Sequence, residues 1–494
     1  MKRKGNRRAW LALGALLGSL AFGSTGYAAE LSLQQAVEMA LAQNTGLRVT
    51  QKAEDSAEAS LREAKGRNGV SVSASDNVSI SKWDNDEHTA SNSLSLNGDL
   101  PLYTGGKNEA NIESGKLGVD TARLKTERER ENLKLEVIKA YYTVLEDYKT
   151  VEVSQETVDK YQAHLTNVQQ LYSAGSKARV DVLRSEVELS NARQTLLRCR
   201  NAYEVDLANL RNLIHLDSDE PLTLTSDFSY DMFAIGMPEA LAYAHTNRKD
   251  LLIDAYAVEQ QALAVQAAKA GYLPTVNLSL GAGQSNVFHP SSTSSHDISA
   301  GLGVNWNIFD SGVTRAQIEK AETEKEIAEL TLLKDQEAID LELRQAYYNM
   351  REAEQRFQST GDAVREAEEN YYIDSEKYRV GEGLMLNIID DQEALATAKL
   401  NYIGAQYDYA RYKAEVENKM GIGLTDSERK AADNLLLTMP QAVEKAAAAV
   451  QQVKEIVPAN LRADKEERQK ARAEAEKSAP PSAGEVADEM AGQG

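Results

Sequence analysis

The feature that most constrains this chain is an internal duplication. The tripeptide Ala140-Tyr141-Tyr142 recurs 206 residues later as Ala346-Tyr347-Tyr348, and the same offset relates Gly175 to Gly381. An offset of 204 aligns residues 33–47 with residues 237–251, so the two copies differ by two residues somewhere in between. A repeat this long makes each half a structural unit. We expect the first unit to cover residues 29–234 and the second to cover residues 235–423.

Each copy contains a very long helix. Residues 107–173 hold no proline, and in the second copy small or apolar residues step alternately by three and four from Leu343 to Tyr378. This heptad pattern is typical of helices that pack along their whole length. At ~1.5 Å per residue the helix would be about 100 Å long. A pair of such helices has too little core alone, so we expect further helices to pack beside it.

A break follows each long helix. The breaks are expected near residues 173–181 and 379–387, where a glycine precedes a short apolar stretch and an acidic helix. Gly175 and Gly381 allow the positive φ that ends many helices. The sequence therefore predicts that the chain reverses direction once in each copy.

Four segments alternate apolar and polar residues with a period of two, which is typical of strands. They are residues 70–81, 93–103, 275–284 and 297–309. Eleven residues at ~3.3 Å, tilted by about 45°, span the roughly 25 Å apolar band of an outer membrane. The alternative is a pair of soluble hairpins whose apolar faces lie on the helices.

The polar face of these segments carries Ser71, Ser73, Ser75, Asn305 and Asn307, which would suit a water-filled lumen. Four strands cannot close a barrel, and an open edge is not tolerated in lipid. Strands in lipid would therefore require an oligomer. Two copies would give eight strands, and three copies would give twelve with room for a passage.

The N-terminus is typical of a secretory signal. Basic residues up to Arg8 precede an apolar run from Ala9 to Gly23, and cleavage is expected after Ala28. Without residues 1–28 the chain has 50 Lys+Arg against 76 Asp+Glu, a net charge of −26. Nucleic acid is therefore not expected as a partner. Residues 424–494 are polar and alanine-rich, which predicts a largely disordered tail.

The sequence offers no constellation for chemistry. Cys199 is the single cysteine and falls on the same heptad pattern in the first copy, between Leu196 and Tyr203; the six histidines are scattered. A lone cysteine forms no disulfide within the chain, and thiolate metal sites need several. We expect no enzyme activity, no cofactor and no metal.

Several features, and the order in which they follow one another, resemble the TolC-like outer-membrane efflux proteins, or outer membrane factors. They are the signal, "LSLQQAVEMALAQNTGLRV", the "LYTGG" and "IFDSG" that follow the hairpins, both "AYY" tripeptides and the glycine breaks. The resemblance runs from about Leu31 to Gly423. It implies a mainly α fold with a membrane β-barrel, in which a homotrimer forms a twelve-stranded barrel in outer-membrane lipid, continuous with a periplasmic helical barrel.

The same resemblance implies a function and partners. Family members are exit ducts of tripartite efflux pumps or type I secretion systems, joined to a periplasmic adaptor (membrane fusion protein) and an inner-membrane transporter. Two other classes remain open from the residues alone. One is a periplasmic or surface coiled-coil scaffold without a pore, and the other is the adaptor itself, although four alternating strands count against it.

The resemblance also implies an adaptor-contact site at the helix breaks. Gly175 and Gly381 match the glycines of the family's periplasmic turns. Ala178, Val180, Leu384 and Met385 flank them and would be the apolar contacts. An ordinary helix terminus is the other interpretation, and it is compatible with the first.

A constriction just inside the turns is implied as well. Asp390 falls on an aspartate position of the family, while Asn387 stands at the neighbouring acidic position and halves the expected charge. Three such carboxylates near an axis would repel each other and favour bound cations. A solvated helix-start aspartate is the alternative. Asp181 matches an acidic position that holds the turns closed, but Gly383 stands where its usual arginine partner would be, which argues against that lock here.

Overall fold

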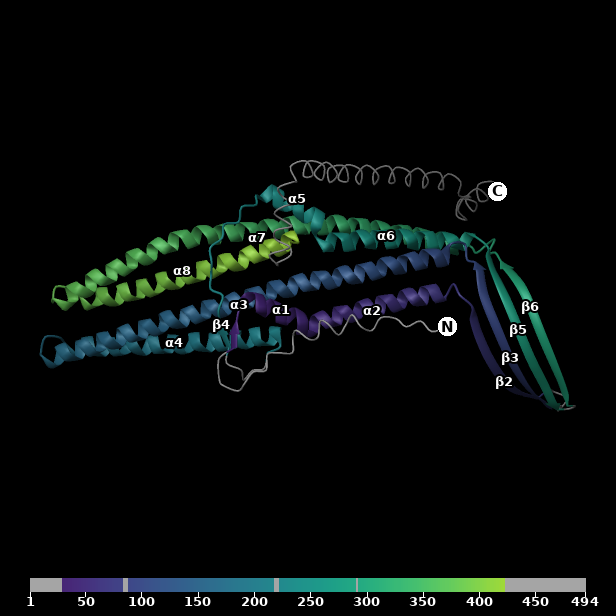
Figure 1. The fold of residues 1–494 in the computed structure, drawn as a ribbon, viewed down its shortest axis with the longest axis horizontal. Coiled ribbons are helices and arrows are strands. Elements are labelled where there is room, and N and C mark those ends of the chain that lie inside the picture. The colour runs from purple at the N-terminus through teal and green to yellow at the C-terminus, as the bar shows by residue number, and fades with distance from the viewer. Residues whose placement is uncertain (1–28, 83–87, 217–221, 290–291, 423–494) are drawn as a thin grey trace, which may run out of the picture.

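The computed structural model describes residues 29–82, 88–216, 222–289 and 292–422 (Figure 1). The expected signal and tail lie outside the described residues. The first copy contains β1 (Ala29–Leu31), α1 (Leu33–Gln43), α2 (Thr45–Gly66), β2 (Ser71–Lys82), β3 (His88–Tyr103), α3 (Lys107–Ser173), α4 (Arg179–Ile214) and β4 (Leu222–Leu224). The second copy contains α5 (Met237–Asn247), α6 (Lys249–Lys269), the 3₁₀ turn η1 (Ala270–Tyr272), β5 (Thr275–His289), β6 (Thr293–Asn305), α7 (Val313–Arg379) and α8 (Met385–Met420).

The elements repeat with the two offsets seen in the sequence. The longer offset relates both ends of α3 to those of α7, and both ends of α4 to those of α8. The shorter offset relates both ends of α1 to those of α5, and the start of β2 to the start of β5. The difference in length between the copies therefore falls between the first strand of the hairpin and the start of the long helix.

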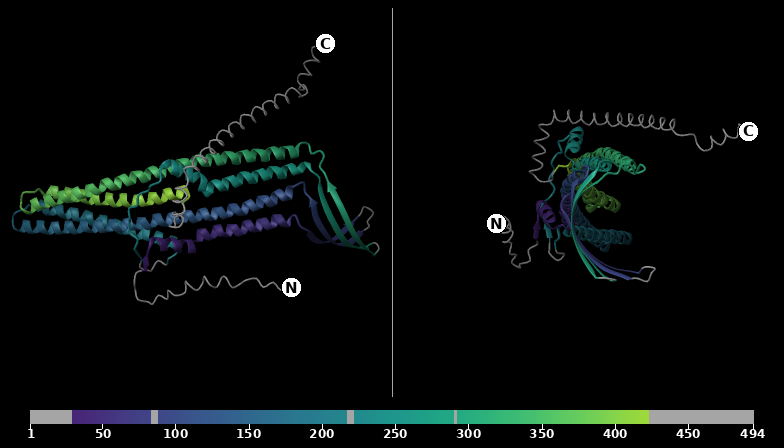
Figure 2. Two further views of the ribbon diagram at one scale, coloured as in Figure 1. Left: turned by 45° about the horizontal axis from the view of Figure 1, so that its top comes forward. Right: turned by 90° about the vertical axis from the view of Figure 1, so that its right-hand side faces the viewer.

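The helices form one curved layer (Figures 1 and 2). α3 and α7 have 67 residues each, or about 100 Å at ~1.5 Å per residue, as predicted. Toward the turns the neighbours are α7, α8, α3 and α4 in that order; toward the sheet they are α7, α6, α3 and α2. None of the described helices combines the length and the apolar character that a membrane span requires.

The four long strands form one antiparallel sheet in the order β2-β3-β5-β6. It extends beyond the ends of the long helices instead of lying on them (Figures 1 and 2). Within the described part of the single chain, the outer strands β2 and β6 each have one edge without a partner strand. Unpaired edges of this length invite pairing with another chain.

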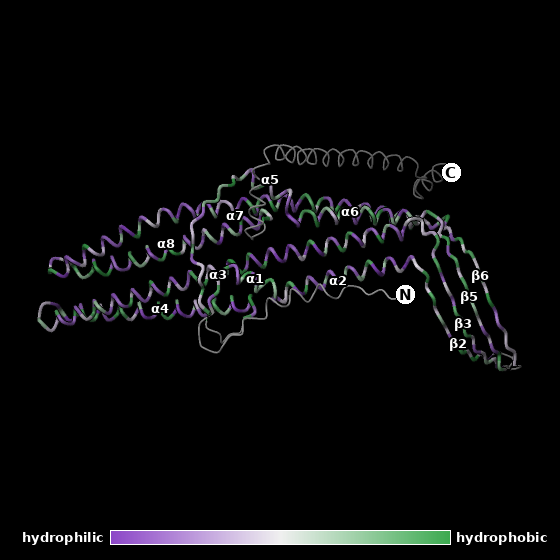
Figure 3. The backbone as a smooth tube through the Cα atoms, viewed as in Figure 1, coloured by the Kyte–Doolittle hydropathy of each residue, from purple (hydrophilic) through white to green (hydrophobic). Residues whose placement is uncertain are grey.

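The two faces of the sheet differ sharply. The alternation runs along every strand in Figure 3. Exposed apolar side chains share one face, among them Val72, Val78, Ile80, Leu94, Leu96, Leu280, Ile298, Leu302 and Val304. Serine, asparagine and glycine share the other face, where the hydroxyls of Ser75 and Ser95 lie 2.7 Å apart. The alternative of hairpins covered by helices is wrong, because Ile298 on the apolar face is 91% exposed.

The strand bounds differ from those predicted. β3 begins at His88 and β5 continues to His289, so both are longer than the alternation of apolar residues indicated. Polar residues near the far end of the hairpins pair through their backbones, for example Ser285 with Ser295. Backbone pairing does not require an apolar side chain, so a period-two pattern underestimates the strand length.

β6 ends at Asn305, earlier than the expected 309. Gly312 has a φ of 86° and is the N-cap of α7. The Asp310 carboxylate accepts bonds from the N–H groups of Gly312 and Thr314 at 3.0 and 2.7 Å. β6 therefore ends opposite Thr275, the first residue of its partner β5, and Asp310 caps α7 instead of extending the ladder.

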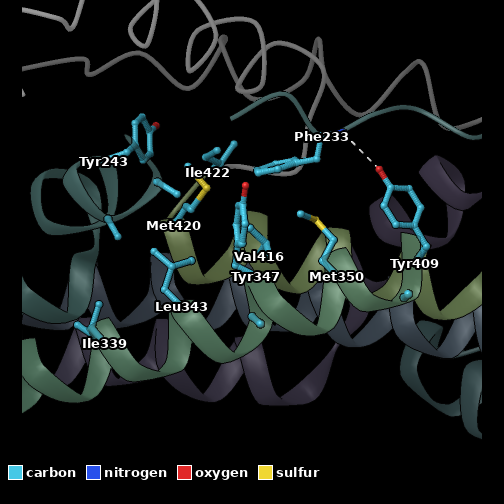
Figure 4. Close-up of a cluster of buried hydrophobic side chains, with 14 of the residues drawn as sticks. Phe233, Tyr243, Ile339, Leu343, Tyr347, Met350, Tyr409, Val416, Met420 and Ile422 are labelled. Atoms are coloured by element: carbon cyan, nitrogen blue, oxygen red, sulfur yellow. Dashed lines mark hydrogen bonds between the residues drawn. The ribbon is translucent and has the colours of Figure 1, made fainter. Parts of the chain in front are cut away.

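The core lies where the short helices cover the long ones. One cluster joins α5, α7 and α8, with Leu343 and Met350 fully buried at its centre (Figure 4). A second joins α1, α3 and α4 around Tyr141 and Val137. The repeated tyrosines anchor chain segments to these cores: Tyr141 donates to the Leu31 carbonyl at 2.9 Å, and its counterpart Tyr347 donates to the Ile235 carbonyl at 3.2 Å.

Candidate functional site: the paired helix turns

The first turn, between α3 and α4, ends its helix with a Schellman motif. Gly175 has a φ of 75° and donates to the Tyr172 carbonyl at 2.9 Å. Ser176 donates to the Leu171 carbonyl, also at 2.9 Å. These two bonds satisfy carbonyls that the end of the helix would leave free, and only glycine takes the left-handed position without strain.

The second turn, between α7 and α8, repeats the motif at the equivalent place in the second copy. Gly381 has a φ of 88° and donates to the Tyr378 carbonyl at 3.1 Å, while Glu382 donates to the Lys377 carbonyl at 2.9 Å. The prediction of positive φ at both glycines is confirmed. The two turns lie at the same end of the molecule, opposite the sheet (Figure 1).

Gly383 gives the second turn a tighter path. A Cβ at this position would lie 2.6 Å from the backbone nitrogen of Tyr378, closer than real Cβ contacts. Gly383 itself donates to the Lys377 carbonyl at 3.0 Å. Any side chain at this position would therefore displace the backbone of the turn.

The predicted contact residues divide into exposed and buried ones. Val180 is 66% exposed, Leu384 is 68% exposed, and Ala178 is exposed as well. Met385 is only 8% exposed, so its predicted role as a surface contact is wrong. It begins α8, and its side chain points into the protomer because the helix faces α3 there.

Met385 belongs to a small core that joins the two turns. The buried members are Val168, Tyr378, Met385, Ile388 and Ile389. They come from α3, α7 and α8, so the two helical hairpins of one chain are packed together near the turns. The exposed apolar side chains of both turns are therefore held on one support.

An aromatic and basic contact strengthens this support, and no sequence pattern indicated it. The Lys177 ammonium lies 4.4 Å from the centre of the Tyr378 ring. This contact joins the first turn to the second helical hairpin. The His164 ring lies 5.6 Å from the same ring. Burial, followed by the nearby Lys177 charge, lowers the pKa of His164. The histidine is therefore held in its neutral form at this position.

The three predicted polar residues lie at the starts of two helices, α4 and α8. Asp181 caps its own helix, since its carboxylate accepts a bond from the Ala178 N–H at 3.1 Å. Asn387 and Asp390 are exposed on the first turns of α8. Burial, then the Asp374 and Asp390 carboxylates, raise the pKa of Asp391. Acidic groups of α7 and α8 therefore gather near the second turn, and Asp390 is the exposed one on α8.

A further acidic pair, missed in the sequence, lies deeper in the helices. Asp147 on α3 and Asp206 on α4 occupy seam positions, between Val144 and Val151 and between Tyr203 and Leu210. Burial and the neighbouring Asp206 and Glu146 carboxylates raise the pKa of Asp147 to about 7, against the opposing effect of Arg411. Listing the charged residues at heptad seam positions would have found both aspartates.

Asp147 predicts a specific pH dependence of stability. Its pKa rises from an ordinary 3.8 to about 7 on folding, so the folded chain binds a proton that the unfolded chain releases. The free energy of unfolding should fall as the pH rises from about 4 to about 7, and then level off. Asp147→Asn should remove this slope and add ~1–2 kcal/mol at pH 8, a figure reduced because water screens part of the side chain.

Thermal unfolding at pH 5 and pH 8 checks this expectation. Asp159→Asn, on an exposed position of the same helix, is the control and should leave the pH dependence unchanged. Equal slopes in the wild-type and Asp147→Asn chains would contradict the assignment.

Among the described residues, no group of three or more histidine, cysteine, aspartate or glutamate side chains could hold a metal ion. Cys199 accepts a contact from the Ser154 hydroxyl at 3.4 Å inside the α3–α4 seam. The turns thus present exposed apolar side chains and backbone at one end of the molecule.

The comparisons with known proteins agree with this architecture. The family model described as "Outer membrane efflux protein" matches residues 36–214 and 240–421, so each copy of the duplication matches separately. The probable efflux pump outer membrane protein TtgC of Pseudomonas putida is 22% identical over 316 residues, which cover 62% of this chain and 63% of TtgC. The outer membrane efflux protein BepC of Brucella suis is 20% identical over 372 residues, covering 75% of this chain and 79% of BepC.

The fold has solved counterparts. The crystal structure of the outer membrane protein VceC from Vibrio cholerae matches with a TM-score of 0.67 at 17% identity, covering 80% of this chain and 97% of VceC. The chain thus spans just under two thirds of the length of TtgC but nearly all of VceC. These matches show that the chain belongs to the outer membrane efflux protein family and is an outer-membrane protein with a long periplasmic helical part.

Proposed function

We propose that three copies of this chain pool their sheets into one closed barrel of twelve strands in outer-membrane lipid. One observation carries the proposal: a four-stranded sheet with two open edges has an apolar face and a face of serine, asparagine and glycine. In lipid the backbone groups of β2 and β6 need partners, and a neighbouring copy supplies them. The apolar face then meets lipid and the hydroxyl face lines a water-filled bore.

The barrel would continue into a tube of helices through the periplasm. The curved layer in Figure 2 supports this arrangement, because copies placed side by side would close the curve. Such an assembly is a passive exit duct of a tripartite efflux pump or type I secretion system. An inner-membrane transporter would supply the energy, and the duct would conduct the substrate to the exterior.

The helix turns would be the docking surface for the periplasmic adaptor. Each repeat unit, 29–234 and 235–423, contributes one turn, so a trimer would present six. Val180 and Leu384 are large apolar side chains exposed at the ends of stiff helices, where they have little to contact within the chain. Gly175 and Gly381, which carry no side chain, allow close approach of another backbone.

Planar-bilayer recordings of the detergent-extracted protein test the duct. We expect stable single-channel conductance from an oligomer that dissociates on heating. A chain that is monomeric and soluble without detergent, and that gives no conductance, would reject the duct and favour a scaffold without a pore.

The exposed Asp390 is proposed to form the acidic ring of a periplasmic constriction, with Asn387 and Asp181 nearby on the same end of the helices. Asp390→Ala should weaken channel block by divalent or trivalent cations by about tenfold, or ~1.4 kcal/mol, because three carboxylates are lost at once. Glu369→Ala is the control, because Glu369 is an exposed acid on α7, farther from the turn, and its loss should not change the cation block. Unchanged block in the Asp390 variant would exclude this residue from the constriction.

A further inference from the structure

The contacts between α3 and α8 indicate how one copy meets the next. These helices belong to different repeats and pack side by side within one chain. Their counterparts under the duplication are α7 and α4, which lie at opposite edges of the helical layer (Figures 1 and 2). An α7–α4 seam equivalent to the α3–α8 seam can therefore form between two copies of the chain.

Lys399 on α8 marks the internal seam with two ion pairs. Its ammonium lies 3.0 Å from the Glu156 carboxylate on α3 and 3.4 Å from the Glu368 carboxylate on α7. The first contact joins the two repeats, and the second stays within the second repeat. Lys399 thus links three helices across the seam.

The counterpart of Lys399 in the first repeat is Arg193 on α4. Arg193 donates to Gln162 on α3 at 2.8 Å, and Gln162 is the counterpart of Glu368. The contact within the repeat is therefore reproduced. The contact between repeats would require the counterpart of Glu156, which is Asp362 on α7, at the far edge of the same chain.

We propose that Arg193 of one copy pairs with Asp362 of the next copy, at the height where Lys399 pairs with Glu156 inside each chain. The signs of the charges are the same in the two seams. Arg193 and Asp362 are both exposed, and the ion pair that Asp362 makes within the chain is with the exposed Arg365, one turn along its own helix. The inference rests on the proposed oligomeric duct and names one contact that holds it together.

The open edges of the sheet fit the same arrangement. β6 leads into α7 at one edge of the molecule, and β2 follows α2 at the other (Figure 1). A neighbour that pairs its β2 with β6 thus also brings its α4 toward α7. A second internal pair, Lys139 with Glu415 at 2.7 Å, has polar but uncharged counterparts, so the charged contact at Arg193 is the more informative one to test.

Chemical cross-linking tests the contact in the full chain in its membrane. Because Cys199 is the only cysteine, a Cys199→Ser background carries no other thiol. Arg193→Cys with Asp362→Cys should give covalent multimers, up to a closed ring, after treatment with a short bismaleimide. Glu156→Cys with Lys399→Cys is the matched control. These two residues are in contact within one chain, so the cross-linked product should run at the mass of a monomer.

The outcomes separate this inference from the proposed function. Multimers from the first pair and monomers from the control support the contact. If the mass of the native complex is that of an oligomer but the Arg193→Cys and Asp362→Cys pair gives no link between chains, the proposed contact is wrong and the proposed duct stands. If the preparation is monomeric, both are rejected.

Charge variants give an independent measurement. Arg193→Glu and Asp362→Lys should each lower the temperature at which the oligomer dissociates, and the double variant that exchanges the charges should restore it. Arg365→Ala is the control, because it removes the partner of Asp362 within the helix and leaves the contact between copies. If the double variant lowers the dissociation temperature of the oligomer as much as the single variants do, the pairing is wrong.

Discussion

Replacing Val180 and Leu384 with aspartate is expected to abolish transport while the oligomer and its conductance remain intact. Both side chains are about two thirds exposed, at 66% and 68%, and lie on the two turns that we propose to dock the adaptor. Losing the burial of each would cost roughly 1.5–3 kcal/mol, so binding should weaken by about 100-fold or more. Adaptor co-purification and substrate efflux in a strain lacking the wild-type chain measure the effect.

Ser176→Asp is the matched control, because it adds the same charge to the first turn without removing an apolar side chain. It should keep most of the adaptor binding. If the double aspartate variant still exports substrate at the wild-type rate, the turns are ordinary helix ends and the adaptor binds elsewhere.

Ile298→Arg is expected to prevent the chain from assembling in the outer membrane. Ile298 lies near the middle of β6 on the apolar face and is 91% exposed in the single chain. An arginine facing lipid near the midplane costs ~2–4 kcal/mol in each copy. The amount of heat-sensitive oligomer in the outer-membrane fraction should therefore fall strongly.

The adjacent Ser299→Arg variant distinguishes the two faces. Ser299 lies on the hydroxyl face, beside Gly281, which leaves space for a longer side chain. We expect normal assembly and altered conductance from this variant. Equal loss of assembly in both variants would mean that β6 does not present one face to lipid and the other to water.

The helical part of the fold was open to prediction because its signals are long and redundant. Residues 107–173 lack proline, the equivalent segment of the second copy carries a heptad pattern, and α3 has the bounds 107–173. Gly175 and Gly381 end their helices with positive φ because the turn requires a conformation that other residues avoid. Because the sequence is duplicated, the helix bounds of the second copy could be predicted from those of the first.

Other features depend on contacts that a sequence pattern does not contain. Met385 looked like an exposed apolar residue of the turn, but α3 packs against the start of α8 and buries it. Asp181 and Asp390 are both acidic residues near a helix start. Only the three-dimensional backbone shows that Asp181 caps its helix and that Asp390 is exposed. The lengths of β3 and β5 follow from backbone pairing, which polar residues satisfy as well as apolar ones.

The most direct measurement is single-particle imaging of the full-length protein in lipid nanodiscs. The account predicts three copies around one axis, with β2 of each copy paired to β6 of the next so that twelve strands enclose an open bore within the lipid. Single chains whose sheet stays open and outside the lipid disc would contradict it.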